Sequence, residues 1–266
     1  MTVVTFLTDF GLQDDFVGTC HGVIAGIAPG VRVIDVTHGI PPQAVLQGAL
    51  VLRSTRPYLP VGVHLAVVDP GVGGDRRAVA VRTVDGRVFV GPDNGLLMLA
   101  ADELGVDAAF ELTDPRFRLD RVSRTFHARD IFAPAAAHLA TGVEPSELGP
   151  AVEPSELVRL DLPEPEVGRV QIAATVLSID RFGNVATNVR REHLVTLGVE
   201  AGARVEIRVA LDRYYAVSAE TFADAGNGEL LLYEDSYGLV TLAIGNGDAA
   251  RLTGAGVGDG LRIAVQ

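Results

Sequence analysis

Apolar residues in the first 150 positions follow two alternating patterns: short runs typical of buried strands and longer stretches with helical spacing. The strand candidates are rich in valine and are bounded by Gly, Pro or Asp. Helical spacing is clearest where Cys20, Ile24 and Ile27 fall on one face. The expected strands are Val3–Leu7, Val31–Thr37, Val63–Val68, Val79–Arg82 and Arg87–Gly91, and the expected helices are Asp15–Ala28, Pro42–Arg56, Asn94–Leu104 and Ile131–Thr141. Strands that alternate with helices predict an α/β domain with a largely parallel sheet over residues 1–160.

The pattern changes from residue 151. Residues 151–168 are rich in proline and glutamate, which is typical of a linker. Beyond them short strand candidates are separated by Gly and Asp, and no long helical period appears. These candidates are Val170–Ile179, Val205–Leu211, Glu229–Tyr233, Leu239–Ile244 and Leu261–Val265. Residues 169–266 are therefore expected to form a second, all-β domain, either a barrel or a sandwich.

Composition excludes several classes of function. The net charge of −12, with no run of basic residues, argues against a nucleic-acid partner. All 22 basic residues are arginines, which rules out a Schiff-base lysine, a pyridoxal-phosphate lysine and a P-loop lysine. Cys20 is the single cysteine, so an intrachain disulfide and a cysteine-pair zinc site are excluded. We expect no membrane partner and a cytoplasmic protein, because no apolar run approaches the ~20 residues of a membrane span and the start lacks a signal-peptide pattern.

Polar, glycine-rich loops follow several of the expected strands, where ligands bind in open α/β sheets. Asp9 comes directly after the first strand, where it could bind a ribose diol or simply form a turn or helix cap. Residues 68–77 bring Asp69 and Arg76 around three glycines, either as a ligand loop or as a salt-bridged turn. This loop lacks the Gly-Lys-Ser/Thr ending of a Walker motif, and no helix follows it as in a dinucleotide fingerprint.

Three further loops carry side chains that could act in chemistry or in turns. Residues 91–95 read best as a turn and cap before a helix. His127 lies among polar residues just before an expected helix, where it could meet Asp69 and Arg76 from another strand end. In the second half, Phe182 and Asn184 could stack on and hydrogen-bond an aromatic base, or could form the tip of a hairpin.

Five segments in this order decide between these alternatives. They are TDFG, VVDPGVGGDRR, GPDNGLL, TFHARDIFAP and IDRFGNVATN. Together they closely resemble the S-adenosyl-L-methionine (SAM) hydrolase family, also called SAM hydroxide adenosyltransferases, which is related to fluorinases and chlorinases. The resemblance covers nearly the whole chain. It implies an N-terminal α/β domain, a C-terminal β-barrel and a homotrimer whose substrate lies between the N-terminal domain of one subunit and the C-terminal domain of its neighbour.

The resemblance also implies roles for individual residues. The Asp-Arg-His set that marks the hydrolases falls on Asp69, Arg76 and His127. The positions that match substrate contacts are Asp9 for the ribose hydroxyls, Asp14 for the methionine part, Phe182 and Asn184 for adenine, Ser236 for the amino-acid end, and Phe126 and Phe222. The implied reaction is in-line attack of water on the ribose C5′ carbon, which gives adenosine and L-methionine. Neither a metal nor a cofactor is expected, because the sulfonium is already a good leaving group.

Some features depart from the family pattern and keep other functions open. Ala128 stands where glycine is expected in hydrolases and serine in fluorinases, and Gly74 replaces a more usual threonine. The chain also has no tryptophan. A SAM-dependent halogenase is one alternative, against which His127 argues, because halogenases carry tyrosine there. A SAM- or adenosine-binding protein without turnover is another, and a structural trimer is a third.

Overall fold

The structure is a computed structural model that describes residues 3–265. The chain forms two compact units, of which the first extends to Leu160 and the second begins at Asp161. Residues 151–160, part of the stretch expected to be a linker, pack on the first unit. Leu157 is buried there, and the backbone N–H of Val158 donates to Asp93 Oδ1 at 2.8 Å.

The first unit is built on a seven-stranded sheet in the order β2-β1-β3-β5-β4-β6-β7. Its strands are β1 (Val3–Thr8), β2 (Arg32–Thr37), β3 (Val63–Val67), β4 (Ala78–Thr83), β5 (Val88–Pro92), β6 (Val106–Glu111) and β7 (Ala151–Val152). The first three pairings in this order are parallel and the last three are antiparallel. The α/β class is confirmed, and the parallel part of the sheet is limited to β2, β1, β3 and β5.

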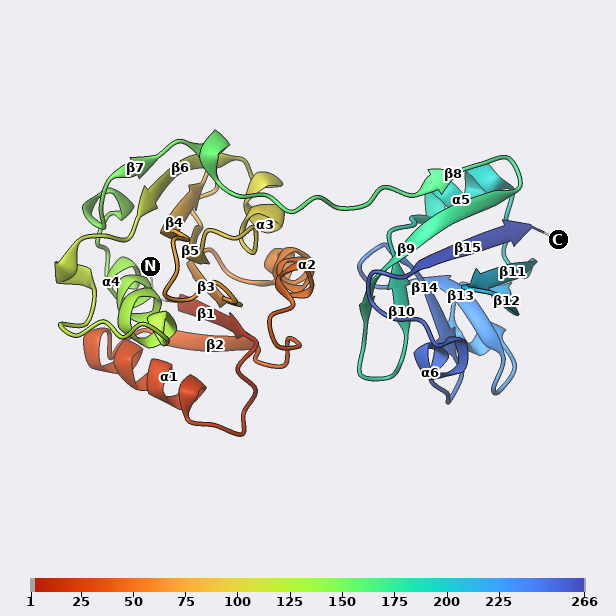
Figure 1. Cartoon of the computed structure of the whole chain (residues 1–266), viewed down its shortest axis with the longest axis horizontal. Coiled ribbons are helices and arrows are strands. Elements are labelled where there is room, and N and C mark those ends of the chain that lie inside the picture. Colours follow the sequence, from red (N-terminus) through yellow and green to blue (C-terminus); the bar gives the residue numbers. More distant parts are fainter. Residues whose placement is uncertain (1–2, 266) are drawn as a thin grey trace. The chain divides into compact units, whose positions relative to one another are not determined.

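Helices cover both faces of this sheet (Figure 1). They are α1 (Phe16–Ile27), α2 (Val45–Thr55), α3 (Met98–Asp102) and α4 (Ala133–Ala140). Helices α1 and α4 pack on one face, and α2 and α3 pack on the other. Alternation along each strand divides the core in two: Phe6 of β1 points to the α1–α4 side, whereas its neighbour Leu7 points to the α2–α3 side. This three-layer arrangement leaves the loops after β1 and β3 at one edge, where ligands bind in such folds.

The second unit is a closed β-barrel. Its strands are β8 (Glu166–Val167), β9 (Gln171–Ile179), β10 (Val185–Thr187), β11 (Arg204–Val209), β12 (Asp212–Ser218), β13 (Leu230–Glu234), β14 (Val240–Ile244) and β15 (Gly260–Val265). They form a sheet in the order β10-β14-β13-β12-β11-β15-β9-β8, and pairing of β10 with β9 closes seven of them into a ring. The expected barrel is confirmed. Two short helices accompany it, α5 (Arg191–Leu197) and α6 (Ala249–Thr253), which the strand-and-turn pattern did not predict.

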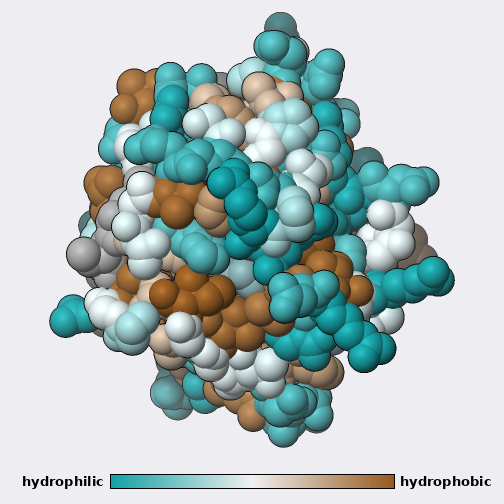
Figure 2. Space-filling model, turned by 90° about the vertical axis from the view of Figure 1, so that its left-hand side faces the viewer, coloured by the Kyte–Doolittle hydropathy of each residue, from teal (hydrophilic) through white to brown (hydrophobic). Residues whose placement is uncertain are grey.

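Two further features concern the helices and the surface of the described residues. Among residues 3–265, no helix combines the length and the apolar character that crossing a bilayer requires. Figure 2 shows one face of the first unit, on which hydrophilic side chains surround several smaller groups of hydrophobic ones.

Candidate active site

A cavity of about 700 Å³ opens at the edge of the sheet where β1 and β3 end. Its walls come from three segments, which follow β1, end β3 and precede α4. Their lining residues are Asp9, Phe10 and Phe16; Val67, Asp69, Pro70 and Val72; and Ser123, Thr125, Phe126, His127, Ala128 and Arg129. Pro42 and Gln43 complete the lining. The volume lies within the usual range for small-molecule sites, ~300–1,000 Å³. All of the lining residues belong to the first unit.

Arg76 links the two other residues of the candidate catalytic set. Its Nε and Nη2 atoms donate to the carboxylate of Asp69, with Nη2 lying 2.5 Å from Oδ2. The same Nη2 lies 2.8 Å from Nδ1 of His127. The guanidinium also lies over the ring of Phe132, with its Cζ atom 5.2 Å from the ring centroid, so a cation–π contact adds to the hydrogen bonds that hold it. Asp69, Arg76 and His127 are therefore brought together, with Arg76 between the carboxylate and the imidazole.

A glycine makes this meeting possible. Gly73 has φ +78°, and a Cβ atom added there would lie 2.2 Å from the backbone oxygen of Arg124. The loop after β3 therefore packs directly on the backbone that leads into His127, which a side chain at this position would prevent. Because β5 lies between β3 and β4 in the sheet, this loop is not the tip of a hairpin. The salt bridge between Arg76 and Asp69 therefore lies in a loop that packs against the segment carrying His127.

His127 sits in an environment that favours its neutral form. Burial lowers the pKa of the imidazole below 6.5 and the charge of Arg76 lowers it further, while the Asp69 carboxylate and the Ser123 backbone oppose them. Arginine has donors only, so Nδ1 of His127 accepts from Arg76. We assign the proton of the neutral ring to Nε2 on this ground. His127 therefore carries its one N–H on Nε2.

The segment that carries His127 is fixed by a buried carboxylate that the sequence analysis did not single out. Asp130 is fully buried, accepts from the backbone N–H of Ser123 at 2.7 Å and forms an ion pair with Arg129. Burial alone would raise the pKa of Asp130, but the hydrogen bonds from Arg129 and Ser123 outweigh it and the pKa is lowered. His127 directly precedes a π-helical turn, η3 (Ala128–Phe132), a distortion that often marks functional sites. The signal for this buried carboxylate in the sequence was the place of Asp130 in the motif that also contains His127.

Asp9 lies in the cavity wall and is oriented by a residue that sequence reasoning missed. Its Oδ2 accepts from the backbone N–H of Gln43 at 2.8 Å. Gln43 has φ +66°, an uncommon left-handed conformation for a residue with a side chain. Two consecutive prolines before Gln43 signal a constrained turn, although its φ could not be read from them. The geometry leaves Oδ1 of Asp9 available to a ligand.

Aromatic side chains line the same cavity. Phe126, one of the predicted contacts, packs edge-on against Phe10 and Phe16, with ring centroids 6.1 and 5.2 Å away. Ala128 is buried and also lines the cavity. Asp14 is exposed and is not among the described residues that line it. Phe10 and Phe16 were not predicted as site residues; Phe16 falls at helical spacing with Cys20 and was assigned to the expected helix Asp15–Ala28.

The four other predicted contacts belong to the second unit. Phe182 and Asn184 lie in the turn of the β9–β10 hairpin, where Asp180 accepts from both backbone N–H groups. Phe182 is 65% exposed. Phe222 is half exposed and packs on Tyr233, with ring centroids 4.9 Å apart, and Ser236 is exposed in the turn between β13 and β14. Burial raises the pKa of Tyr233, and the nearby Asp235 and Asp180 raise it further.

The remaining candidate loop is structural. Asp93 is buried and pairs with Arg77 at 2.7 Å. Asn94 donates to the backbone oxygen of Val68 at 2.8 Å, which ties residues 91–95 to the end of β3. This agrees with the interpretation of the segment as a turn and cap.

Comparisons with known proteins cover nearly the whole chain. Residues 4–149 match the SAM hydroxide adenosyltransferase N-terminal domain, and residues 174–262 match the corresponding C-terminal domain. A protein of Salinispora arenicola named (R)-S-adenosyl-L-methionine hydrolase is 51% identical, over 98% of this chain and 97% of its own. A fluorinase of Actinoplanes sp. is 30% identical over 91% of this chain and 90% of its own.

A solved structure gives the same result. The crystal structure of an uncharacterized conserved protein from Thermotoga maritima superimposes with a TM-score of 0.92 at 36% identity, covering 98% of this chain and 99% of that one. Both domain matches, the identities and the superposition agree, and the chain belongs to the SAM hydroxide adenosyltransferase family.

Proposed function

We propose that this chain hydrolyses S-adenosyl-L-methionine to adenosine and L-methionine. The observation that carries the proposal is the contact of Asp69, Arg76 and His127 at one cavity, in a chain 51% identical to a protein named (R)-S-adenosyl-L-methionine hydrolase. Relatives named fluorinase are only 30% identical in sequence to the chain. The hydrolase is therefore the better supported of the two activities.

The chemistry needs little beyond the positioning of a water molecule. The water oxygen forms a bond to the ribose C5′ carbon while the C5′–S bond breaks, and the electron pair of that bond goes to sulfur, which leaves as the neutral thioether of methionine. Holding the water in line removes much of the entropic barrier. The water loses one proton as the new C–O bond forms, so a nearby base assists the step.

We assign the two parts of this task to different side chains. His127, neutral and with its proton on Nε2, donates a hydrogen bond that orients the water. The Asp69 carboxylate accepts the proton through Oδ1, because Oδ1 accepts only one hydrogen bond from Arg76 and retains a lone pair, whereas Oδ2 accepts two. Arg76 does not contact the reacting atoms in this scheme; it holds both partners through its rigid donor fork.

The substrate-binding roles are proposals of the same kind. Asp9 would accept hydrogen bonds from the ribose hydroxyls, and Phe126 would contact the nucleoside within the cavity. Phe182, Asn184, Phe222 and Ser236 would act from the barrel of a neighbouring subunit in a homotrimer. Support for the trimer comes from the family resemblance and from the division of the candidate residues between the two units. The role of Asp14, the cytoplasmic location and the absence of a cofactor stay predictions.

The reaction is tested with purified protein in chloride-free buffer that contains a chelator. We expect adenosine and methionine to appear in equal amounts, and His127→Ala to abolish most of this release. His138→Ala is the matched control. His138, in α4, is another partly buried histidine of the first unit, and it packs on Phe117. Formation of 5′-chloro-5′-deoxyadenosine, only when chloride is added, would contradict the hydrolase assignment.

Assembly is tested by light scattering combined with activity on dilution. A trimer whose site needs two subunits loses specific activity as it dissociates. A monomer with full activity would contradict the shared site while leaving the hydrolysis itself standing.

A further inference from the structure

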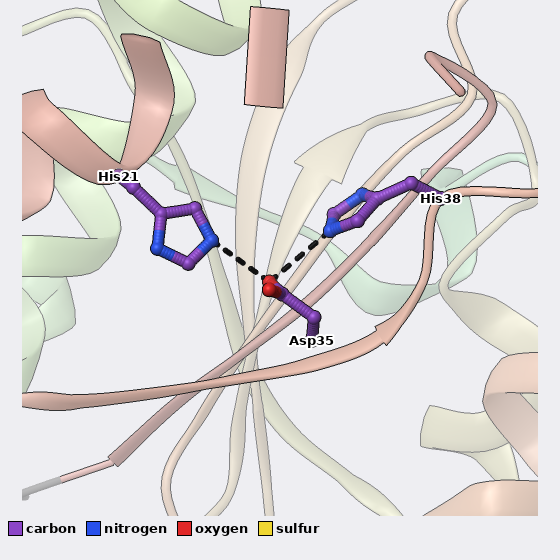
Figure 3. A group of neighbouring side chains, drawn as sticks. All are labelled: His21, Asp35 and His38. Atoms are coloured by element: carbon purple, nitrogen blue, oxygen red, sulfur yellow. Dashed lines mark hydrogen bonds and ion pairs between the residues drawn. The ribbon is translucent and has the colours of Figure 1, made fainter. Parts of the chain in front are cut away.

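A cluster of two histidines and one carboxylate lies on the first unit, apart from the residues that line the cavity. His21 comes from α1, Asp35 from β2 and His38 from the loop after β2 (Figure 3). Nε2 of His21 lies 2.8 Å and Nε2 of His38 lies 3.1 Å from the same atom, Oδ1 of Asp35. One ligand atom from each residue lies within 4.8 Å of the others. In residues 3–265, this is the one group of three or more His, Cys, Asp or Glu side chains that meets such a criterion.

The buried member of the cluster has an unsatisfied nitrogen. The side chain of His38 is 3% exposed, and its Nδ1 lies 2.8 Å from the hydroxyl of Thr8. Its Nε2 is close enough to Asp35 for a hydrogen bond, but the angles do not make one, and within the described chain it has no hydrogen-bond partner. In the tautomer with the proton on Nδ1, which then donates to the Thr8 hydroxyl, the Nε2 lone pair faces a carboxylate oxygen. Two electron-rich atoms that face each other in this way favour a cation between them.

The two imidazoles are also held in place without an ion. The ring of Phe6 packs against both, with centroids 5.9 Å from His21 and 4.9 Å from His38. Figure 3 shows the rings approaching the carboxylate from opposite sides. The Thr8 hydroxyl on Nδ1 of His38 is the kind of outer partner that orients a metal-bound histidine.

We propose that His21, Asp35 and His38 bind a divalent transition-metal ion, with Zn²⁺ as the preferred ion and water as the fourth ligand. Two imidazole nitrogens and one carboxylate oxygen are a common zinc donor set. In a tetrahedral zinc site neighbouring ligand atoms are ~3.3 Å apart, given bonds of ~2.0–2.1 Å. The two distances to Oδ1 of Asp35 therefore need to lengthen by only a few tenths of an ångström, and the two histidine nitrogens, which lie within 4.8 Å of each other, need to reach the same spacing. The side chains of His21 and Asp35 are 34% and 45% exposed, which leaves the ion a path from solvent and a position for water.

The bound ion would tie the helix and the second strand to the candidate substrate loop. The backbone oxygen of His38 accepts from the N–H of Gly11 at 2.8 Å, and Thr8 lies directly before Asp9. The ion is structural in this proposal and takes no part in hydrolysis. The inference therefore stands on the cluster itself and is independent of the proposed function.

The test uses the full chain, stripped with a chelator and dialysed, and measures Zn²⁺ binding by calorimetry and Co²⁺ binding by visible absorption. We expect one ion per chain, the d–d bands of a tetrahedral site with Co²⁺, and a higher melting temperature with Zn²⁺. His21→Ala and Asp35→Asn should each weaken Zn²⁺ binding by about 100-fold or more, because the first removes a ligand and the second replaces a charged ligand with a neutral amide, whereas loss of a mere outer partner of a ligand costs ~10–100-fold. Both residues lie at the surface, so the variants should fold, which circular dichroism checks.

His193→Ala is the matched control, since it removes another histidine that lies beside a carboxylate, 3.9 Å from Glu192, on the second unit. This variant should bind Zn²⁺ as the wild type does. The proposal is overturned if the stripped wild type shows no saturable binding, or if His21→Ala and Asp35→Asn bind as tightly as the wild type. Adenosine release is measured separately, so that loss of the metal site and loss of hydrolysis are distinguishable.

Discussion

Arg76 donates from Nη2 to Nδ1 of His127 across 2.8 Å. Because the guanidinium has no acceptor and stays protonated, this contact determines which ring nitrogen of a neutral His127 carries the proton. It also makes a second proton on the ring unfavourable, since the new N–H would face a cation. The role that His127 can play in the reaction therefore depends on a neighbour 51 residues away in the sequence.

Two substitutions of His127 distinguish a donor from a base. His127→Ala should lower kcat by about 100-fold or more with little change in substrate affinity. In His127→Gln the side-chain amide can supply an N–H near the position of Nε2, so we expect a substantial part of the activity to return. Single-turnover kinetics and calorimetry measure the two effects. Equal loss in both variants would show that the ring acts as the base, and near-normal turnover in His127→Ala would show that it is structural.

Asp69→Asn should lower turnover by at least about 100-fold, because an amide neither accepts the proton nor holds the guanidinium of Arg76 as firmly. Asp93→Asn is the comparison, since Asp93 forms a similar buried pair with Arg77 outside the proposed chemistry. That variant should lower the melting temperature and leave the turnover of the folded protein nearly unchanged. Both are measured by thermal unfolding and initial rates. Similar turnover in Asp69→Asn and the wild type would remove the carboxylate from the mechanism.

The pH dependence of kcat/KM should reflect the lowered pKa of His127. Burial and the charge of Arg76 favour the neutral ring, so the active form persists below pH 6.5 and is lost only as the pH falls further. The acid limb of the profile should therefore have its midpoint below 6.5. Initial rates at saturating and limiting substrate, from about pH 5 to 8, measure it. A midpoint above 6.5 assigned to His127 would contradict the lowered pKa of this residue.

Asp9 and Gln43 should affect substrate affinity more than turnover. Asp9→Ala should raise the substrate dissociation constant by about 10-fold or more, because hydrogen bonds to a charged group contribute ~1.5–3 kcal/mol. Gln43→Pro removes the N–H that orients Asp9 and cannot adopt φ +66°, so it should have a similar effect. Gln43→Gly keeps the N–H and tolerates this φ, so its affinity should stay near that of the wild type. Calorimetric binding to the four proteins is the measurement, and equal affinity in all four would exclude this role for Asp9.

His64 should make the protein less stable in acid. It is fully buried between β1 and β5, hydrogen-bonded to Thr5 and stacked on Phe89, and burial lowers its pKa from 6.5 to about 4. Below pH 6.5, His64 binds a proton in the unfolded chain but stays neutral in the folded chain. The free energy of unfolding therefore falls as the pH drops towards 4. At about 1.4 kcal/mol per pKa unit, this loss amounts to about 3 kcal/mol. Above pH 6.5 the effect is absent.

Denaturant unfolding at several pH values measures this loss. His64→Leu should flatten the acid dependence by a comparable amount, whereas His193→Ala, which removes a histidine near the surface, should leave it unchanged. An unaltered pH dependence in His64→Leu would mean that other groups cause the acid sensitivity.

Local sequence patterns predicted the elements that bury one continuous apolar face. Helix α1 and strands β1, β3 and β9 were predicted to within one residue at each end, because Val, Ile and Leu recur there with the period of the element. Strands β6 and β12 were missed, since one is rich in alanine and acidic residues and the other carries polar and tyrosine side chains. Helix α3 is shorter than predicted because its apolar residues continue beyond the helical turns.

The motifs by themselves determined the family, the two-domain class and the identity of the residues proposed for catalysis. Only the tertiary structure decided that Arg76 stands between Asp69 and His127, that Gln43 holds Asp9, and that His21 and His38 share Asp35. The physical reason is that periodicity along the chain records which face of an element is buried. The contacts between loops depend instead on strand pairing over long sequence distances, here parallel pairing of β1 with β3 and the insertion of β5 beside it.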